Sequence, residues 1–564
     1  MISPPENLVE RLSSLSQAQR QEVLRRLGKR PATREIGVSI PKAPRDHALH
    51  RLSLAQERLW FLEHLQPGLA VYNIAVALRL RGSLDLGRLR SALQALISRH
   101  EALRSAVVTQ AGTGYQKILD EAALELTVDD LASLPDHEQE AALRRRADAE
   151  VARPFDLTVP PLLRARIFRL ASNHHVLVLT VHHIVADGWS MNVLLRDLIV
   201  AYEKARFNGQ ELLTESALQF LDFSEWNRKN NIDQDWSVAL EKWHQLIDSH
   251  AALELVDPSA RPKERSYAGG CLRFRVPQPV MATLDSLCRQ TQTTPNVAFL
   301  AAFQVLLSRY CGQEHFLVGM PVANRELSES ADIVGFLVDT RAVPADLSGR
   351  PCFREMLSRV RATMLDELSQ KAIPFDRLVD ELSVPRIANQ SPLFQVLFSY
   401  QGASAIDEIR FPGLELEYFP VHTGTAKFDL TLGIYVNAGV HYGELEYNTD
   451  IIDQAFAERM LDHWLRLLQA AGANPEVAVA DLSILTPAER DQQLTQWNPA
   501  GELAWPDRGV VAWFEQTVSG RGSAEAVRCG DSALGYGELN AAANRLARHL
   551  IGCGVQPGAR VGLL

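Results

Sequence analysis

The sequence is poor in cysteine and lacks any closely spaced cysteine pair. Six cysteines lie scattered between residues 271 and 553 of the 564 residues, and none belongs to a Cys-x-x-Cys motif. A disulfide framework and a structural zinc site both need cysteines at closer or regular spacing. The composition therefore predicts reduced thiols and a cytoplasmic protein.

Long apolar runs and blocks of one charge are missing as well. The longest apolar run, residues 297–307, is interrupted by Gln304 and is far shorter than the ~20 residues that cross a bilayer. The N-terminus lacks the basic and apolar segments of a signal peptide. Charges of both signs are mixed, with a net charge of −10. Neither a nucleic acid nor a membrane is an expected partner.

The length points to several domains. A chain of 564 residues is too long to fold around a single core. At about 150 residues per domain, the length predicts three or four units. Leu and Val recur at helical spacing over residues 8–28, and a polar, proline-containing stretch follows up to residue 44. Strand and amphipathic-helix patterns then alternate to about residue 485 without a detectable repeat. This alternation is typical of α/β layered sandwiches, and we expect two of similar size.

Several elements of this α/β region can be located from the sequence. Leucines at three- and four-residue steps predict a helix over residues 85–100. Apolar strands are expected at 71–80 and, with interruptions, at 163–185, and Ser190 is expected to cap a helix over 191–204. Further strands are expected at 271–276, 316–321, 334–343, 394–400 and twice within 432–447, and further helices at 353–368 and 456–471.

The strongest chemical signal lies in residues 182–188, His-His-Ile-Val-Ala-Asp-Gly. They follow an apolar strand, in which successive side chains point to opposite faces, so His182 and His183 must face different surroundings. Asp187 and Gly188 reverse the chain, and glycine permits a close backbone approach. A histidine on the open face, fixed by a nearby carboxylate, is a candidate for proton handling during acyl transfer.

This segment resembles the HHxxxDG motif of nonribosomal peptide synthetase condensation domains, which are similar to chloramphenicol acetyltransferase. Further motifs of that family match in order and spacing over residues 46–485. They are SLAQERLWFL (53–62), RHEALR (99–104), FLDFSEW (220–226), GMPVANR (319–325) with VGFLVDT (334–340), IPFD (373–376) and KFDLT (427–431). The resemblance implies an α/β fold of two chloramphenicol acetyltransferase-like lobes in a V-shape, with the active site in a tunnel between them.

The resemblance also implies a domain order. The expected parts are an N-terminal helix and linker (1–45), an N-lobe (46–228), a C-lobe (229–485), a linker (486–504) and the start of an adenylation domain (505–564). The last part resembles that family through LGYGEL (534–539). Its phosphate-binding loop is missing, so adenylation is not expected. The chain stops within an apolar stretch, which predicts that this domain continues beyond it.

The implied function is amide-bond formation. The α-amine of an acceptor aminoacyl thioester attacks a donor acyl or peptidyl thioester, and both travel on the 4′-phosphopantetheine arms of upstream and downstream peptidyl carrier domains. The adenylation domain is a further partner, and neither a bound cofactor nor a metal is expected. One alternative is a starter-type domain that joins a fatty acyl group to the first amino acid. Another is a catalytically inert scaffold that recruits carriers.

The resemblance assigns roles around the motif. His183 is expected to face the tunnel and to accept a proton as the tetrahedral intermediate forms or collapses. Gly188 is the candidate backbone donor to the oxyanion, and His182 is expected to point inward and support the turn. A thioester is already activated and an α-amine titrates near pH ~8. Positioning is therefore expected to contribute more than the base.

Other residues are expected to support or line the site. Asp187 is expected to pair with Arg99 or Arg104 and so fix the loop. Trp226 is expected to serve packing rather than substrate contact. Asp339 stands where the family usually has Asn, and this exchange replaces two donors by a charge in the tunnel lining or at the lobe interface.

Overall fold

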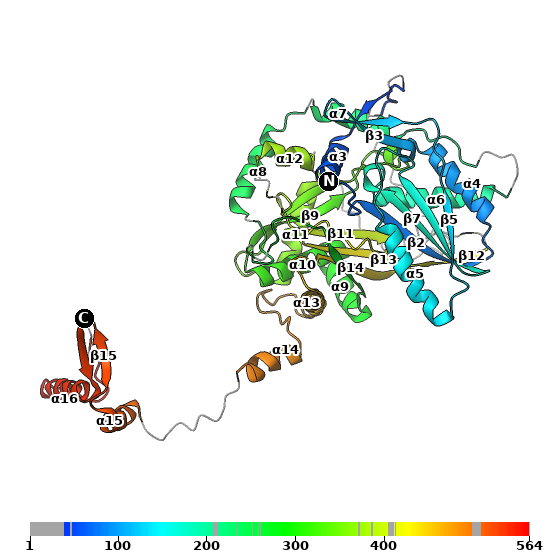
Figure 1. The fold of residues 1–564 in the computed structure, drawn as a ribbon. Coiled ribbons are helices and arrows are strands. Elements are labelled where there is room, and N and C mark those ends of the chain that lie inside the picture. The colour runs from blue at the N-terminus through cyan, green and yellow to red at the C-terminus, as the bar shows by residue number, and fades with distance from the viewer. Residues whose placement is uncertain are drawn as a thin grey trace, which may run out of the picture. The chain divides into compact units, whose positions relative to one another are not determined.

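The computed structural model describes most of the chain, drawn as a ribbon in Figure 1. The described residues are 39–45, 48–206, 212–232, 234–250, 252–257, 259, 261–369, 373–384, 387, 389–403, 411, 413–498 and 509–562. They form two compact units, one up to Ile484 and one from Leu485 onward. The helix expected over residues 8–28 lies outside the described residues. Of the helices described, none is both long and apolar enough to cross a membrane.

The N-lobe of the first unit is built on a five-stranded sheet between two layers of helices. Its strands are β2 (Asn73–Gly82), β5 (Leu126–Asp130), β6 (Leu163–Ala171), β7 (His174–His182) and β12 (Leu414–Tyr418), and its main helices are α4 (Leu86–Arg99), α5 (Asp136–Val151) and α6 (Gly188–Lys204). The strand order is β12-β2-β7-β6-β5. Alternate side chains of β2 and β7 enter two cores, one shared with α4 and α6 and the other with α5.

Shorter elements surround this sheet or pack against the C-lobe. They are the strands β1 (His50–Arg51), β3 (Ser105–Gln110) and β4 (Thr113–Ile118), which form a small sheet of their own, and the helices α3 (Leu54–Leu65), α7 (Phe220–Ile232), α8 (Ser237–Ser249) and α12 (Phe375–Glu381). The helix expected over residues 85–100 is confirmed as α4. The expected helix over 191–204 is longer and begins at Gly188.

The C-lobe is built on a six-stranded sheet in the order β10-β9-β11-β13-β14-β8. These strands are β8 (Gly269–Arg275), β9 (His315–Val322), β10 (Asp339–Asp346), β11 (Val396–Ala403), β13 (Leu430–Asn437) and β14 (Val440–Asn448), and the helices α9 (Gln278–Thr291), α10 (Pro295–Cys311), α11 (Phe353–Ser369) and α13 (Gln454–Ala473) share one core with them. The opposite face of the sheet turns toward the N-lobe, because Tyr435 of β13 contacts Tyr418 of β12 at a ring-centroid distance of 6.4 Å.

The C-lobe contributes one strand to the N-lobe sheet. The chain leaves the C-lobe after β11 and adds β12 to the edge of the N-lobe sheet, where Leu414 pairs with Gly82 and Tyr418 with Leu78. The sequence did not predict β12, because its five residues carry no sign of the sheet that they join. The crossing ties the lobes together along β2.

One expected strand is shorter than predicted. Residues 334–343 read as one apolar run, but β10 begins only at Asp339. Val334, Phe336 and Leu337 are instead buried in the N-lobe core. This part of the run therefore serves as a contact between the lobes rather than as a strand.

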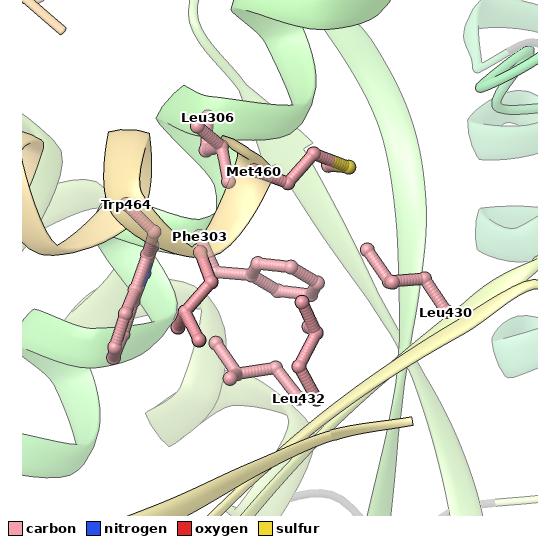
Figure 2. A pocket seen from close by; sticks show the side chains of 8 residues that line it. Phe303, Leu306, Leu430, Leu432, Met460 and Trp464 are labelled. Atoms are coloured by element: carbon pink, nitrogen blue, oxygen red, sulfur yellow. The ribbon is translucent and has the colours of Figure 1, made fainter. Parts of the chain in front are cut away.

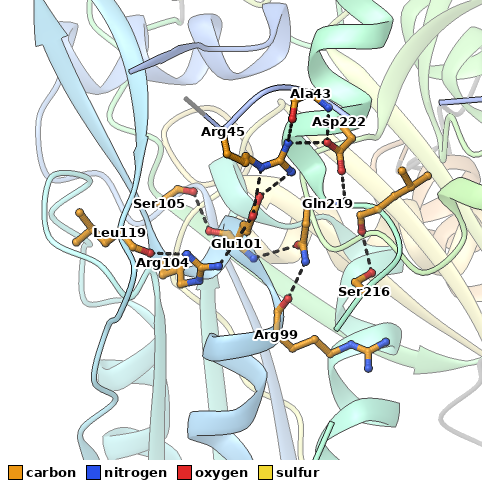
Figure 3. A network of polar contacts seen from close by, with 11 residues as sticks. Ala43, Arg45, Arg99, Glu101, Arg104, Ser105, Leu119, Ser216, Gln219 and Asp222 are labelled. Atoms are coloured by element: carbon orange, nitrogen blue, oxygen red, sulfur yellow. Dashed lines mark hydrogen bonds and ion pairs between the residues drawn. The ribbon is translucent and has the colours of Figure 1, made fainter. Parts of the chain in front are cut away.

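The segment before β1, residues 39–45, packs against both lobes, and we call it the N-terminal strap. Ile40 is only 3% exposed, and its backbone N–H donates to Glu329 of the C-lobe at 3.1 Å. Arg45 forms an ion pair of 2.7 Å with Asp222 of α7 (Figure 3). The end of the predicted linker is thus a fixed part of the first unit.

A small cavity lies inside the C-lobe core rather than between the lobes (Figure 2). Its lining is entirely apolar and comes from α10, α13 and the strands β13 and β14. The lining residues are Phe303, Leu306, Leu430, Leu432, Leu445, Met460, Leu461 and Trp464. A cavity without polar partners does not hold water. We interpret it as a packing void and not as a substrate site.

The second unit is small. It contains α14 (Pro487–Asp491), α15 (Val510–Arg521), β15 (Glu525–Cys529), β16 (Ser532–Gly535) and α16 (Tyr536–Gly552). No residue of α15 or α16 is buried, and Trp513 remains 50% exposed. These elements alone do not build a closed core.

Candidate active site

His183 stands where β7 ends and a short 3-10 turn begins. Its backbone N–H donates to the carbonyl of Tyr72 at 2.8 Å, and its Nδ1 lies 2.9 Å from the carbonyl oxygen of Ala186. A carbonyl only accepts hydrogen bonds, so Nδ1 carries the proton and Nε2 keeps its lone pair. The ring packs against Phe336 of the C-lobe at 4.6 Å. The lobe contact and the turn together fix the ring and its tautomer.

The surroundings keep His183 uncharged. Burial lowers its pKa well below the ordinary 6.5, and the positive charge of Lys427 lowers it further. An uncharged imidazole with a free Nε2 accepts a hydrogen bond from an amine but binds a proton weakly. The site is therefore suited to orienting an amine and passing on a proton, and it does not act as a strong base.

His182 occupies the opposite face of the strand, as the alternation of side chains predicts. Its side chain is buried beside the rings of Tyr72 and Phe155, with centroids 6.4 and 6.0 Å away. Its Nδ1 accepts the backbone N–H of Ile184 at 3.2 Å, and burial lowers its pKa to about 3. His182 thus supports the turn from inside.

Asp187 is buried at the junction of the lobes and gathers donors from both. It caps α6 by accepting the backbone N–H of Ser190 at 2.7 Å, so the expectation that Ser190 caps this helix is wrong. The backbone N–H groups of Leu337 and Val338 donate to its other oxygen at 3.1 Å. The guanidinium of Arg325 also forms an ion pair with the carboxylate of Asp187, with a nitrogen–oxygen distance of 3.1 Å.

The expected partners of Asp187 were wrong. Arg99 forms an ion pair with Asp197 of α6 at 3.2 Å, and Arg104 donates to the carbonyl of Leu119. Figure 3 shows both arginines in the network of the N-terminal strap. The reason is geometric. Arg99 ends α4 and Arg104 follows it, both on the N-lobe side, whereas Asp187 opens α6 toward the C-lobe.

Arg325 was the residue that sequence reasoning missed. It closes the segment 319–325, which carries the family resemblance, but no partner could be assigned to it. Its guanidinium also donates to the carbonyls of Ser330 and Ile333 at 2.7 and 2.8 Å. These bonds hold the C-lobe loop against the start of α6.

Gly188 begins α6 and is exposed at the same junction. A Cβ atom placed on Gly188 would have only the side-chain amide of Gln401, 3.9 Å away, within 4 Å. The backbone of Gly188 therefore borders an open space between the helix start and strand β11. Its part as oxyanion donor stays a prediction.

Trp226 and Asp339 each have partners other than His183. Trp226 of α7 packs on Phe223 at 5.9 Å and against the N-lobe core, in keeping with a packing role. Asp339 accepts the backbone N–H of Thr340 at 2.8 Å and lies 3.7 Å from Arg341. The carboxylate is thus held within the C-lobe at the start of β10.

Residues 48–494 match a family model described as "Condensation domain". The chain is 36% identical over 517 residues to one linear gramicidin synthase of Brevibacillus parabrevis, a match that covers 91% of this chain and 10% of that protein. It is also 36% identical over 528 residues to a dimodular nonribosomal peptide synthase of Bacillus subtilis (strain 168), covering 91% of this chain and 22% of that one.

Among solved structures, the complex of the X-domain and OxyB from teicoplanin biosynthesis aligns with a TM-score of 0.69 and 26% sequence identity. The alignment covers 80% of this chain and 98% of the matched one. The two-lobed α/β architecture expected from the sequence is therefore confirmed, and the chain spans about a tenth of the length of the gramicidin synthase.

Proposed function

The chain belongs to the condensation domain family of nonribosomal peptide synthetases, and from this premise we propose that it joins two carrier-bound substrates through an amide bond. The donor is an acyl or peptidyl thioester, and the acceptor is the α-amine of an aminoacyl thioester. The observation that carries the proposal is the state of His183. Its ring is uncharged, its Nδ1–H donates to the carbonyl of Ala186, and its Nε2 keeps a lone pair.

In the proposed reaction the acceptor nitrogen attacks the thioester carbon while one of its N–H groups donates to Nε2 of His183. A C–N bond forms and the carbonyl becomes a tetrahedral oxyanion, which the backbone N–H of Gly188 would stabilise. The C–S bond then breaks. The proton lost by the nitrogen passes through Nε2 to the departing sulfur, so the imidazole ends uncharged and no covalent intermediate forms on the protein.

Positioning outweighs basicity in this scheme. General base catalysis contributes about 10²–10⁴-fold, whereas holding two reactants in line reaches effective molarities on the order of 10⁵ M or more. The lowered pKa of His183, caused first by burial, makes it a weak base. The fixed tautomer and the Phe336 contact instead make it a precise hydrogen-bond acceptor.

The proposed partners are an upstream donor carrier and a downstream acceptor carrier, each with a 4′-phosphopantetheine arm. We also assign residues 505–564 to the start of an adenylation domain, supported by the LGYGEL segment, which runs from β16 into α16. A cytoplasmic location is part of the proposal, because all six cysteines are free thiols. A fatty acyl donor, as in a starter-type domain, is the alternative substrate.

A carrier-recruiting scaffold without catalysis is the second candidate function. It is favoured by the solved structure of a similar domain, the X-domain, in complex with another protein, OxyB. The fixed tautomer of His183 and the buried hydrogen bonds and ion pair of Asp187 argue for catalysis, because the recruitment of carriers alone requires neither.

The test is a condensation assay in which both carriers are loaded chemically and products are identified by mass spectrometry. We expect product with the wild type, a loss of about 10²-fold or more with His183→Ala, and no change with His137→Ala, whose side chain is 80% exposed. Product formation by His183→Ala at the wild-type rate would reject the role of His183. Failure with fatty acyl, L-aminoacyl and D-aminoacyl donors alike would favour the scaffold.

A further inference from the structure

Lys427 opens the KFDLT segment, and its backbone is held from several sides. Arg265 donates to the carbonyl of Lys427, and the neighbouring Ala426 N–H donates to Tyr267 at 2.9 Å. Two residues further on, Asp429 forms a buried ion pair with Arg261. The segment before β13 is therefore a rigid base from which the lysine side chain extends.

The side chain of Lys427 crosses from the C-lobe to the N-lobe. Its Nζ lies 5.2 Å from the ring centroid of Tyr72, a cation–π distance. The carbonyl of the same Tyr72 holds the backbone N–H of His183 at 2.8 Å. Lys427 and His183 thus share Tyr72 as a common neighbour, although they come from different lobes.

The charge of Lys427 is not neutralised by a direct partner. Among the residues that the structure describes, its ammonium forms no ion pair. The charged groups that affect it are Glu446, which favours the ammonium, and Arg58, which opposes it. Burial lowers the pKa of Lys427 to about 8, so the ammonium persists at neutral pH. An unpaired, half-buried charge acts over a longer range than an exposed one, because water screens it less.

We propose that Lys427 is a positioning residue of the condensation reaction, whose fixed positive charge adds to burial in keeping His183 an uncharged hydrogen-bond acceptor and favours the anionic tetrahedral intermediate. This inference rests on the proposed function. It gives a role to a lysine of one lobe whose ammonium lies against an aromatic ring of the other. A lysine that served packing alone would be replaced by methionine without effect on the titration of His183.

The first test follows the titration of His183 directly, by NMR of protein labelled with ¹³C at the histidine Cε1, with His183→Gln to assign the signal. The groups that face His183 are Lys427 and His182, and the pKa of His182, at about 3, leaves it uncharged over the working range. In Lys427→Met we expect His183 to take up its proton at a higher pH than in the wild type. In Lys427→Arg, which keeps the charge, we expect the wild-type titration.

The second test measures turnover, and its pH dependence needs only the conservative variant. We expect the ratio of the wild-type rate to that of Lys427→Arg to fall above pH 8, where lysine loses its charge and arginine keeps it. Titration of the acceptor amine is common to both proteins and cancels in the ratio. For Lys427→Met we expect kcat to fall about tenfold, which corresponds to about 1.4 kcal/mol.

The outcomes separate this inference from the proposed function. An unchanged His183 titration in Lys427→Met, or a rate ratio that does not vary with pH, overturns the role of Lys427 in an active protein. An upward shift of the titration in a protein that makes no product from any donor would instead reject the proposed function. Should Lys427→Met fail to fold, the pH dependence of the arginine ratio still decides.

Discussion

Arg325 and Asp187 form a buried ion pair that joins the C-lobe to the start of helix α6. The two groups are 3.1 Å apart, and their side chains are 2% and 1% exposed. Asp187 opens the helix that follows the turn carrying His183, and Arg325 holds the loop after β9. The relative placement of His183 and the C-lobe surface therefore depends on a contact between residues that are 138 positions apart.

Breaking this pair should destabilise the protein and reduce turnover together. Arg325→Met leaves the buried carboxylate of Asp187 without its cation, which costs about 3–5 kcal/mol. We expect a lower urea midpoint and a matching fall in condensation rate. The control is Arg350→Met. Arg350 and Asp481 lie at a similar distance, 2.9 Å, but are 69% and 56% exposed, and exposed pairs contribute about 0–1 kcal/mol. Equal losses in the two variants would contradict the prediction.

The sequence predicted what local spacing determines. Leucine periodicity located α4, and strand alternation separated His182 from His183, because both follow from the geometry of a single element. Partners from distant segments were not predictable. Nothing in the sequence near Asp187 favours Arg325 over Arg99 as its partner, since Arg325 reaches Asp187 only once the lobes are packed.

The apolar run at residues 334–338 illustrates the same limit. Strands and buried loops are both apolar, so hydrophobicity alone extended the predicted strand into a segment that serves as a lobe contact. The role of Lys427 was hidden for a related reason. Its aromatic partner, Tyr72, lies in the other lobe, and only the folded structure brings the two together.

Acid should destabilise the fold through His182. Its folded-state pKa of about 3 lies below the ordinary 6.5, so between these values the unfolded chain binds more protons than the folded one. This contribution to stability is complete above pH 6.5 and is lost as the pH falls toward 3. The slope for one fully coupled group is about 1.4 kcal/mol per pH unit.

The matching variant is His182→Asn, whose side-chain oxygen can replace Nδ1 as acceptor for the Ile184 N–H. We expect the free energy of unfolding of the wild type to exceed that of His182→Asn at pH 7 and the difference to shrink at pH 5, as measured by urea titration. The same comparison for His137→Asn, at an exposed site, should show no such change. A difference that stays constant with pH would refute the role of His182.

Asp339→Asn should be well tolerated. The carboxylate is 3.7 Å from Arg341, and so loose a pair contributes less than about 1 kcal/mol. Burial raises the pKa of Asp376, the charge of Arg58 opposes this, and Asp339 adds to it, so removal of Asp339's charge should lower the pKa of Asp376. We expect a small change in the urea midpoint and retained condensation activity. Asp376→Asn, which weakens a 3.1 Å pair with Arg58, should cost more stability.

Gly188 and Gly319 separate an effect on catalysis from an effect on folding. A Cβ on Gly188 has its first neighbour at 3.9 Å, whereas a Cβ on Gly319 would lie 2.2 Å from the ring of Phe394. Because the new methyl group of Gly188→Ala enters open space and not a packed core, this variant should have nearly the melting temperature of the wild type. The alanine variant keeps the backbone N–H, but its methyl group would occupy the space where the proposed mechanism places the thioester carbonyl and hold the oxyanion away from that donor. We therefore expect condensation to fall by about 10²-fold, as when an oxyanion contact is lost. Gly319→Ala should instead reduce the free energy of unfolding by about 1–3 kcal/mol through overpacking, and the melting temperature should fall with it. Calorimetry and the two-carrier assay on both variants provide the measurement. Full activity of Gly188→Ala would contradict the role of Gly188 as oxyanion donor. The orienting role of His183 would then have to explain the rate.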